Sequence, residues 1–461
     1  MKIKIQCIID NGSQSTTEDI VFLEREELAP ETLGLSLKEA KTITSEIQKK
    51  MIAHQITDFV SQKHFCSCCG STLSIKGYHP LIYRTLFGKI CLKSPRLLTC
   101  KCQFQPQSSF SPLSSILSEH LSPELSYLEA KWASLMSYGM TVKLLEEVLP
   151  LKTYSSSVFH TLQKISTRLE KELKEERPIF IEGCQSQWNQ LPRPATPITV
   201  SLDGGYVHAR EGENRKAGWF EVIVGKSVQE GHESKRFGYV TNYETKPKRK
   251  LYEMLQKQGL QMNQDITFLT DGGDTVRDLP LYLSPRSEHI LDWFHITMRI
   301  TVLKQMSKGV MGKDYSDFEK NLDRAKWFLW HGNAFKSLDV LESLSSELEI
   351  FSENKEHKKY KIYRVLSEFY DYINLNRDFI SNYGERYRHG EAVSSSLAES
   401  TVNEVVSRRM SKKQQMRWTQ KGAHSLLQVR TKTLNNELRD SFKNGLNYRS
   451  GANANYEGSF V

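Results

Sequence analysis

The stretch Pro197-Ile-Thr-Val-Ser-Leu-Asp203-Gly204-Gly205 is a run of β-branched and apolar residues that leads into a carboxylate and two glycines. It predicts a buried strand whose last side chain is Asp203. The same pattern recurs at Ile266-Thr-Phe-Leu-Thr-Asp271-Gly272-Gly273. Because glycine has no Cβ, a bulky ligand can approach the backbone there. Two such strands side by side would hold Asp203 and Asp271 where a divalent cation can bridge them. The alternative interpretation is that each Asp-Gly pair only forms a turn.

The segments around these two motifs predict the fold class. After Asp203 come two strand candidates, 219–224 and 237–242, and then a helix that ends near Gly259. Asp271 closes the next strand, and a strand at 289–292 runs directly into a further helix. Three strands, a helix, and then alternating strands and helices are typical of an α/β layer fold with a mixed sheet. The helical pattern that follows is rich in aromatics, which we expect to be mostly core.

Length and composition suggest a multidomain protein without export signals. A chain of 461 residues has room for about three domains. It carries 63 Lys and Arg against 54 Asp and Glu, a net charge of +9. The polar start does not fit a signal peptide, and no apolar run approaches the ~20 residues that span a bilayer. We therefore expect a cytoplasmic protein with no membrane partner.

Cysteines cluster in one part of the chain, with six of the eight between Cys66 and Cys102. Cys66-x-x-Cys69-Gly is a knuckle that points two thiolates at one centre, and Cys100 with Cys102 would complete a tetrahedral site for one structural Zn²⁺. The second pair is C-x-C, so Cys68 and Cys91 are spare candidates. Residues 83–93, between the pairs, predict a β-hairpin. The alternative is a group of free thiols packed as small hydrophobic side chains.

Helical segments stand on either side of the cysteines. Ser36-Leu-Lys-Glu39 is a capping box that opens an amphipathic helix to about Gln62. Residues 111–177 are helical again, with a start at Ser122-Pro123-Glu124 and a break expected at Gly139. A short helix, a turn and a longer helix are compatible with a helix-turn-helix reader of DNA, although any helical hairpin shows this pattern.

Residues 405–432 form a basic segment within a predicted helical stretch, 394–433, that should break near Gly422. The segment holds eight Lys or Arg residues and no acid, in a chain that is 25% charged. Such a run favours phosphate binding over a merely solvated helix face. Trp418 could stack on an unpaired base, the alternative being a core position. The candidate DNA-binding residues are Arg408, Arg409, Lys412, Lys413, Arg417, Trp418 and Lys421.

Taken together, these segments resemble the DDE-type transposases of bacterial insertion sequences, specifically the Kra-type group that is related to the ISL group. The resemblance covers about residues 30–432. The segments that carry it are Leu33–Lys41, Cys66–Gly70, Arg84–Gly88, Cys100–Cys102, the two Asp-Gly-Gly motifs, Asp292-Trp-Phe-His295, and Ala398-Glu-Ser through Arg408-Arg409 and Met416-Arg-Trp418 to Arg430.

The resemblance implies an RNase H-like catalytic core with a helical insertion ahead of its last acidic residue. It implies a triad, Asp203, Asp271 and Glu399, that binds two Mg²⁺ ions, with Asp292 and His295 beside the active site. The expected organisation is an N-terminal pair of strands with a helix (1–63), a Cys₄ zinc module (64–104), a helix-turn-helix-like DNA-binding region (111–177), a linker (178–197), the first part of the core (196–297), the helical insertion (298–392), the last catalytic helix with the basic segment (393–440), and a disordered tail (441–461).

The expected function is DNA transposition, with double-stranded transposon ends and target DNA as partners and at least two subunits on the DNA in the bacterial nucleoid. Two metal ions ~3.5–4 Å apart activate water and stabilise the leaving 3′ oxygen. The freed 3′-OH can then attack target DNA at the same site. Two alternatives stay open: an RNase H-like nuclease without strand transfer, and a non-catalytic DNA-binding regulator built on the zinc and helical modules.

The choice of Glu399 over Glu404 as the third acid depends on helix geometry. At about 100° per residue, Glu399 projects within the arc of Val402 and Val406 and leans toward the sheet. Glu404 projects ~140° away, beside Arg408, where it would form a surface ion pair. The alternative is that Glu399 only favours the dipole near a helix N-terminus.

Overall fold

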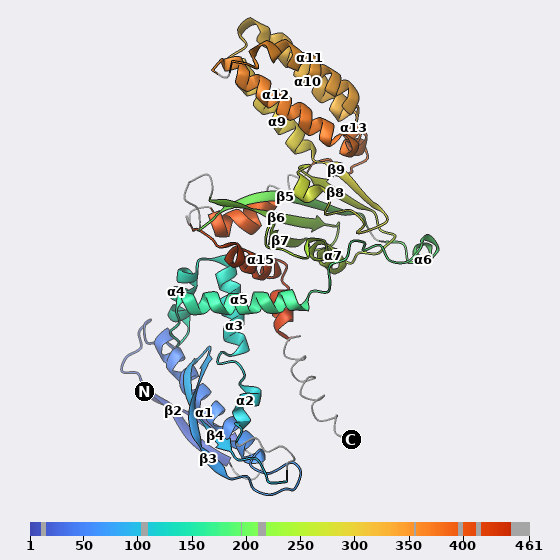
Figure 1. Cartoon of the computed structure of the whole chain (residues 1–461). Helices are drawn as coiled ribbons and strands as arrows, with labels where there is room; N and C mark the ends of the chain where they lie inside the picture. The colour runs from blue at the N-terminus through green and yellow to red at the C-terminus, as the bar shows by residue number, and fades with distance from the viewer. Residues whose placement is uncertain are drawn as a thin grey trace. The chain divides into compact units, whose positions relative to one another are not determined.

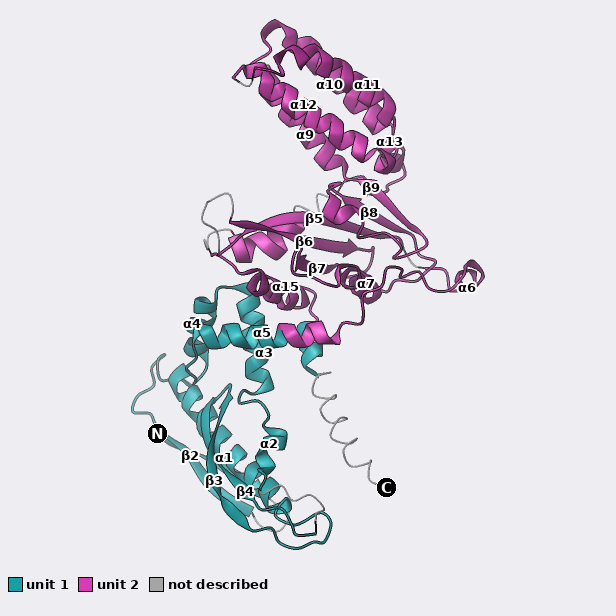
Figure 2. Cartoon of the chain, in the orientation of Figure 1, with its two compact units in different colours: residues 1–165, 438–461 teal, residues 166–437 magenta. Residues whose placement is uncertain are grey.

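A computed structural model describes residues 1–10, 15–102, 109–194, 196–210, 218–354, 356–394, 400–411 and 416–443. The chain divides into two compact units, residues 1–165 with 438–461, and residues 166–437 (Figure 2). The border lies inside helix α5 (Ser155–Glu172) and not in the predicted linker 178–197. Over the described residues, no helix has the length and apolar character needed to cross a membrane.

The first unit contains two antiparallel hairpins and a group of helices. The capping box of Ser36 and Glu39 is present at the start of α1, as predicted. The predicted hairpin at 83–93 is confirmed and is longer than expected. Gly139 does not end a helix: Ser137 caps α4, so Gly139 lies in its first turn. The elements are β1 (Lys2–Asp10), β2 (Ser15–Glu24), α1 (Leu37–Gln62), β3 (Ile75–Thr85), β4 (Gly88–Leu97), α2 (Pro112–Ile116), α3 (Pro123–Leu135) and α4 (Tyr138–Val148).

The second unit is built on a five-stranded mixed sheet with the order β7-β6-β5-β8-β9 (Figure 1). Strand β6 runs antiparallel to both β5 and β7, whereas β5, β8 and β9 run parallel to one another. This confirms the predicted mixed-sheet α/β fold. The elements are α6 (Gln185–Asn189), β5 (Ile198–His208), β6 (Trp219–Val228), β7 (Lys235–Val240), α7 (Pro247–Gln258), β8 (Ile266–Thr270), α8 (Asp274–Arg277) and β9 (Ser287–Leu291).

A helical subdomain follows β9 and has its own hydrophobic core (Figure 1). It begins at Trp293, directly after the strand, and most of its aromatics are core, as expected. Trp327 is an exception, with 58% of its surface exposed. The helices are α9 (Trp293–Lys308), α10 (Tyr315–Trp330), α11 (Ala334–Leu348), α12 (Lys358–Leu375) and α13 (Tyr383–Arg388), joined by 3₁₀ turns at Gly312–Asp314, Glu349–Phe351 and Arg377–Phe379.

The C-terminal part differs from the sequence expectation in two ways. The predicted helix at 394–433 contains a π-helix, η4 (Asn403–Ser411), and then the α-helix α15 (Gln420–Leu434). Gly422 lies buried within α15, so the helix does not break there; Thr419 caps its start. Residues 438–443 are helical, which includes the first three residues of the predicted tail 441–461, and Phe442 is buried against Tyr127. Residues 444–461 lie outside the described part.

Candidate functional site

The sheet brings three acidic residues to one edge. Leu202 of β5 pairs with Thr270 of β8, and Thr270 pairs with Leu291 of β9, all in parallel register. Asp203, Asp271 and Asp292 each follow these paired residues by one position. Because parallel neighbours point the same way, their carboxyl ends meet at the same edge of the sheet. Two motifs 68 residues apart in sequence, at Asp203 and Asp271, are therefore adjacent in the fold.

The structure corrects the role of the strand and its glycines. Asp203 does not end β5, which continues to His208 paired with β6, and only the parallel partner stops at Thr270. A Cβ at Gly205 would lie 3.0 Å from Val402, so this glycine accommodates close packing and not a ligand. Gly272 has a φ of +78°, and a Cβ there would lie 2.6 Å from Leu291. Glycine is needed at position 272 for its backbone conformation as well as for space.

Electrostatics at this edge are those of crowded carboxylates. The pKa of Asp203 is raised to about 6: burial is the largest cause, the positive charge of His295 opposes it, and the negative charges of Asp271 and Asp292 add to it. Desolvation and like charges both disfavour the ionised form of a carboxyl group. A cation bound at this edge would offset the free-energy cost of ionising Asp203. A carboxyl group whose pKa is strongly raised by its surroundings is a candidate functional residue.

Asp271 and Asp292 also have structural roles. One oxygen of Asp271 accepts a hydrogen bond from the backbone N–H of Gly273 at 3.0 Å, so the turn interpretation holds for this residue as well. Asp292 is 1% exposed and caps α9 by accepting from the N–H of Phe294 at 2.9 Å. His295 Nε2 lies 3.8 Å from the second oxygen of Asp292. Asp292 thus holds the start of α9, and with it His295, beside Asp203.

The described residues supply only some of the ligands that a metal ion at this edge would need. Glu399, the expected third acid, lies outside them. Over the described chain, two groups of three or more possible ligand residues have their donor atoms all within 4.8 Å of one another, and Asp203, Asp271 and Asp292 are not among them. Carboxylate oxygens are the donors that Mg²⁺ prefers. Asp203 and Asp271 therefore fit a shared magnesium site by chemistry and by position, with one further ligand still needed.

Four cysteines of the first unit form the first of those groups. The sulfur atoms of Cys66, Cys69, Cys100 and Cys102 lie within 4.8 Å of one another. Cys66 Sγ is 3.5 Å from Cys102 Sγ, and Cys69 Sγ is 3.4 Å from Cys100 Sγ. A tetrahedron with Zn–S bonds of ≈ 2.3 Å has edges of about 3.8 Å, so the cluster has the size of a zinc site. This is the predicted ligand set, without Cys68 or Cys91.

Hydrogen bonding lowers the pKa of two of these thiols, whereas bonds with the neighbouring thiols raise the pKa of Cys102. A hydrogen bond with Ser71 lowers the pKa of the Cys69 thiol to about 6. The backbone N–H groups of Cys69 and Cys68 lower the pKa of Cys66. Thiolate is the form that ligates zinc, and four protein ligands leave no position for a substrate. The site is therefore suited to a structural metal.

The second group, which the sequence did not reveal, is a buried ionic cluster of Glu170, Glu244 and His424. Lys250 Nζ lies 2.6 Å from Glu170 and 3.1 Å from Glu244, and only 5% of its side chain is exposed. His424 Nε2 lies 3.2 Å from Glu170. The chain thus supplies its own cation to the two carboxylates, and the cluster ties α5, α7 and α15 together. No local pattern marks it, because its members are more than 70 residues apart or on different elements.

The basic segment 405–432 is less exposed than the sequence suggested. Arg409 is 0% exposed, with its guanidinium 5.3 Å from the ring of Trp418, which is itself 4% exposed. Neither side chain presents a surface to DNA, which corrects their assignment as DNA-binding residues. Arg408, Arg417 and Lys421 are exposed, and Lys412 and Lys413 lie outside the described residues.

The ion pair of Glu404 also differs from expectation. Its carboxylate binds Arg236 of β7 at 2.9 Å and not Arg408. The reason is that residues 403–411 form a π-helix, with a wider turn than the α-helix assumed in the angular argument.

No protein-family model matches the chain, and no curated protein matches it. Among solved structures it is similar to a Drosophila P element transposase strand transfer complex, with a TM-score of 0.31 and 10% identity over 69% of this chain and 93% of that one. A crystal structure of NurA matches with a TM-score of 0.11 and 14% identity over 51% of this chain and 64% of that one. At such TM-scores neither likeness carries a conclusion about fold or activity.

Proposed function

We propose that the chain is a DDE-type DNA transposase of the Kra-type group, with an RNase H-like core. The observation that carries the proposal is the placement of Asp203 and Asp271 on adjacent parallel strands, with Asp292 and His295 beside them. The sequence resemblance supplies the family, and the mixed sheet with a helical subdomain after β9 is compatible with it. The partners would be double-stranded transposon ends and target DNA, bound by two or more copies of the chain.

The chemistry follows from the carboxylates. Asp203 and Asp271 would hold Mg²⁺, with Glu399 as the expected third ligand. When bound, two Mg²⁺ ions activate the attacking oxygen and stabilise the leaving 3′ oxygen of an in-line displacement. Asp292 would position His295 at the edge of the site by anchoring the first turn of α9. The Cys₄ cluster would hold a structural zinc and take no part in the reaction.

Labelled transposon ends incubated with a target plasmid and Mg²⁺ test the proposal. The wild-type chain should give joined product, and Asp203→Asn and Asp271→Asn should each abolish cleavage and joining while DNA binding persists. Asp274→Asn is the matched control, because this neighbouring acid has 87% of its side chain exposed and pairs with the nearby Arg277. Near wild-type cutting by Asp203→Asn or Asp271→Asn would refute the site.

The same assay separates the two alternatives. Nicked or cut ends without joined product would indicate a nuclease without strand transfer, and bound but uncut DNA in the wild type would indicate a regulator. Glu399→Gln should remove cleavage, and Glu404→Gln should leave most of it, because Glu404 is already paired with Arg236.

Cleavage should also depend on pH through Asp203. Its pKa is raised to about 6, so the carboxyl group binds a proton below that pH and is free to bind a cation above it. We expect the Mg²⁺ concentration for half-maximal cleavage to rise as the pH falls below about 6. An unchanged Mg²⁺ requirement between about pH 7.5 and about pH 5.5 would contradict a ligand role for Asp203.

A further inference from the structure

The first unit contains a longer acid-free stretch than the basic segment 405–432. Residues 59–118 include no Asp or Glu, although the chain has 54 of them in 461 residues. The stretch covers the Cys₄ cluster and the β3–β4 hairpin. Its cationic residues are Lys63, Lys76, Arg84, Lys89, Lys93, Arg96 and Lys101.

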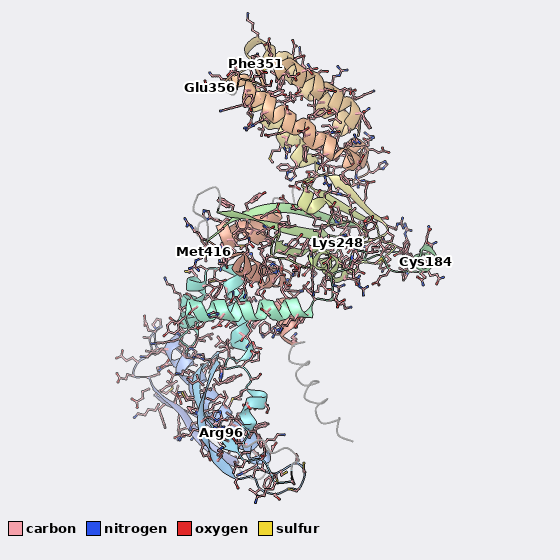
Figure 3. All side chains as sticks on the ribbon, in the orientation of Figure 1. Arg96, Cys184, Lys248, Phe351, Glu356 and Met416 are labelled. Atoms are coloured by element: carbon pink, nitrogen blue, oxygen red, sulfur yellow. The ribbon has the colours of Figure 1, made fainter. Side chains whose placement is uncertain are left out.

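All of these cations are exposed. Figure 3 shows the side chains of this region, with Arg96 labelled. Within the described part of the chain none of the seven forms an ion pair; Arg96 donates a hydrogen bond to Ser109 at 3.3 Å, and Lys63 lies 6.0 Å from the ring of Phe59. These cations are therefore exposed to solvent and open to contact by a partner.

The hairpin gathers three of these charges on one face. Arg84 of β3 stands directly opposite Lys89 of β4 in the antiparallel register. Lys93 is four residues further along β4, and side chains two and four residues apart share a face of a strand. The opposite face of β4 is buried through Ile90 and Leu92. Like charges directly opposite one another destabilise a hairpin, and a bound anion would relieve that repulsion.

A cavity adjoins this face within the first unit. Its volume is about 520 Å³, and Arg84 and Lys89 line it together with Lys41 and Lys152. Two carboxylates also line it, but both are engaged within the protein. Glu129 accepts hydrogen bonds from Thr153 and Thr161, and Glu146 accepts one from the backbone N–H of Thr153. Arg84 also interacts electrostatically with Glu129. The four cations that line the cavity outnumber its two carboxylates, so the hairpin face and the cavity mouth carry an excess of positive charge.

We propose that this face, made by Arg84, Lys89 and Lys93 with Lys152 at the adjoining cavity, binds the phosphate backbone of double-stranded DNA. A two-stranded ribbon is one of the elements that the major groove admits, and phosphates line both rims of that groove. Clustered Lys and Arg on one face, without acids, are the electrostatic footprint of a nucleic-acid interface. The choice of DNA as the polyanion rests on the proposed function.

The test measures binding of a fluorescent DNA duplex by anisotropy over a series of salt concentrations, with full-length, zinc-loaded protein and no added magnesium. The test variant combines Arg84→Ala, Lys89→Ala and Lys93→Ala. The control combines Lys313→Ala, Lys358→Ala and Lys361→Ala, three exposed lysines of the helical subdomain, and lowers the net charge equally. Zinc content and thermal unfolding of each variant show whether the fold is kept.

We expect the test variant to flatten the plot of log K against log salt by about one unit for each phosphate that is no longer neutralised, up to about three units, and the control to keep the wild-type slope. A second variant, Arg84→Lys with Lys89→Arg and Lys93→Arg, keeps all three positive charges and should keep the wild-type slope. This variant still tests the proposal if the alanine variant fails to fold. An unchanged slope in the alanine variant, or an equal loss in the control, would overturn the proposal.

These outcomes are independent of the catalytic assignment. If the alanine variant loses binding while Asp203→Asn still cuts, the hairpin proposal stands and the transposase site is wrong. If Asp203→Asn is inactive while the alanine variant binds with the wild-type slope, the hairpin proposal alone is wrong.

Discussion

Residues 405–432 and residues 59–118 are both free of acids and rich in Lys and Arg, but only the first stretch buries some of its cations. In the first, Arg409 and Arg430 are buried, at 0% and 4% exposed. In the second, all cations are exposed. The two stretches look alike by composition, so composition alone does not separate a surface for phosphate from a cationic core.

The difference lies in which groups stabilise a buried guanidinium. Arg430 Nε donates to the backbone carbonyl of Val405 at 2.7 Å, and Arg409 lies over the ring of Trp418. Carbonyl oxygens and aromatic faces satisfy Arg without any carboxylate, because the guanidinium is a planar donor that stacks. A stretch without acids can therefore be core, provided that its cations are arginines with such partners.

The largest expected effect on this comparison comes from removing a zinc ligand, which should unfold the zinc-binding region. Cys66→Ser should unfold residues 64–104 and abolish the exposed cationic face, since structural Zn²⁺ contributes about 10–16 kcal/mol in zinc-finger peptides. Hydrogen exchange should show loss of protection in β3 and β4, and metal analysis should fall from about one zinc per chain to none. Cys68→Ser is the control and should keep both; equal loss in the control would contradict the ligand set.

The next largest effect is expected from replacing the buried Arg409. Arg409→Ala should lower the free energy of unfolding of the second unit by about 3 kcal/mol, because it leaves a cavity beside Trp418. The adjacent, exposed Arg408→Ala should change it by less than about 0.5 kcal/mol. Urea unfolding followed by tryptophan fluorescence measures both. Similar small values for the pair would mean that the segment is a surface after all.

A smaller effect concerns the acid that precedes the basic segment. Glu404→Gln should cost about 1 kcal/mol, because its ion pair with Arg236 at 2.9 Å is only partly shielded from solvent. A double-mutant cycle with Arg236→Gln isolates the pair, and a coupling energy near zero would show that the carboxylate is not paired with Arg236.

The smallest effect is a gain in stability. Lys89→Glu would replace the like-charge pair opposite Arg84 by an ion pair and should stabilise the hairpin by about 0.2–1 kcal/mol. The same substitution should weaken binding of duplex DNA and flatten its salt dependence. Thermal unfolding and fluorescence anisotropy on one preparation measure the stability and the DNA affinity. If the stability and the affinity both rose or both fell, the result would contradict the proposal that this face gives up stability in order to bind DNA.

Much of the molecule follows from local signals in the sequence. The alternation of apolar runs and turns predicted the strands of the mixed sheet, the capping box predicted the start of α1, and the cysteine spacing predicted the Cys₄ cluster, which the structure contains. Each of these signals lies within a few residues or within a known ligand spacing. The two strand-Asp-Gly-Gly motifs also pointed to neighbouring carboxylates, since parallel strands end at one edge.

Only the tertiary structure decided the features that depend on distant neighbours. The continuation of β5 past Asp203 depends on its pairing with β6, and the need for glycine at 205 depends on Val402, 197 residues away. The burial of Arg409, the Glu404–Arg236 pair and the Lys250 cluster likewise arise from packing between elements that no local pattern encodes. Propensity and periodicity determine which elements form and which face is apolar, whereas side-chain partners are set by packing between segments that are far apart in the chain.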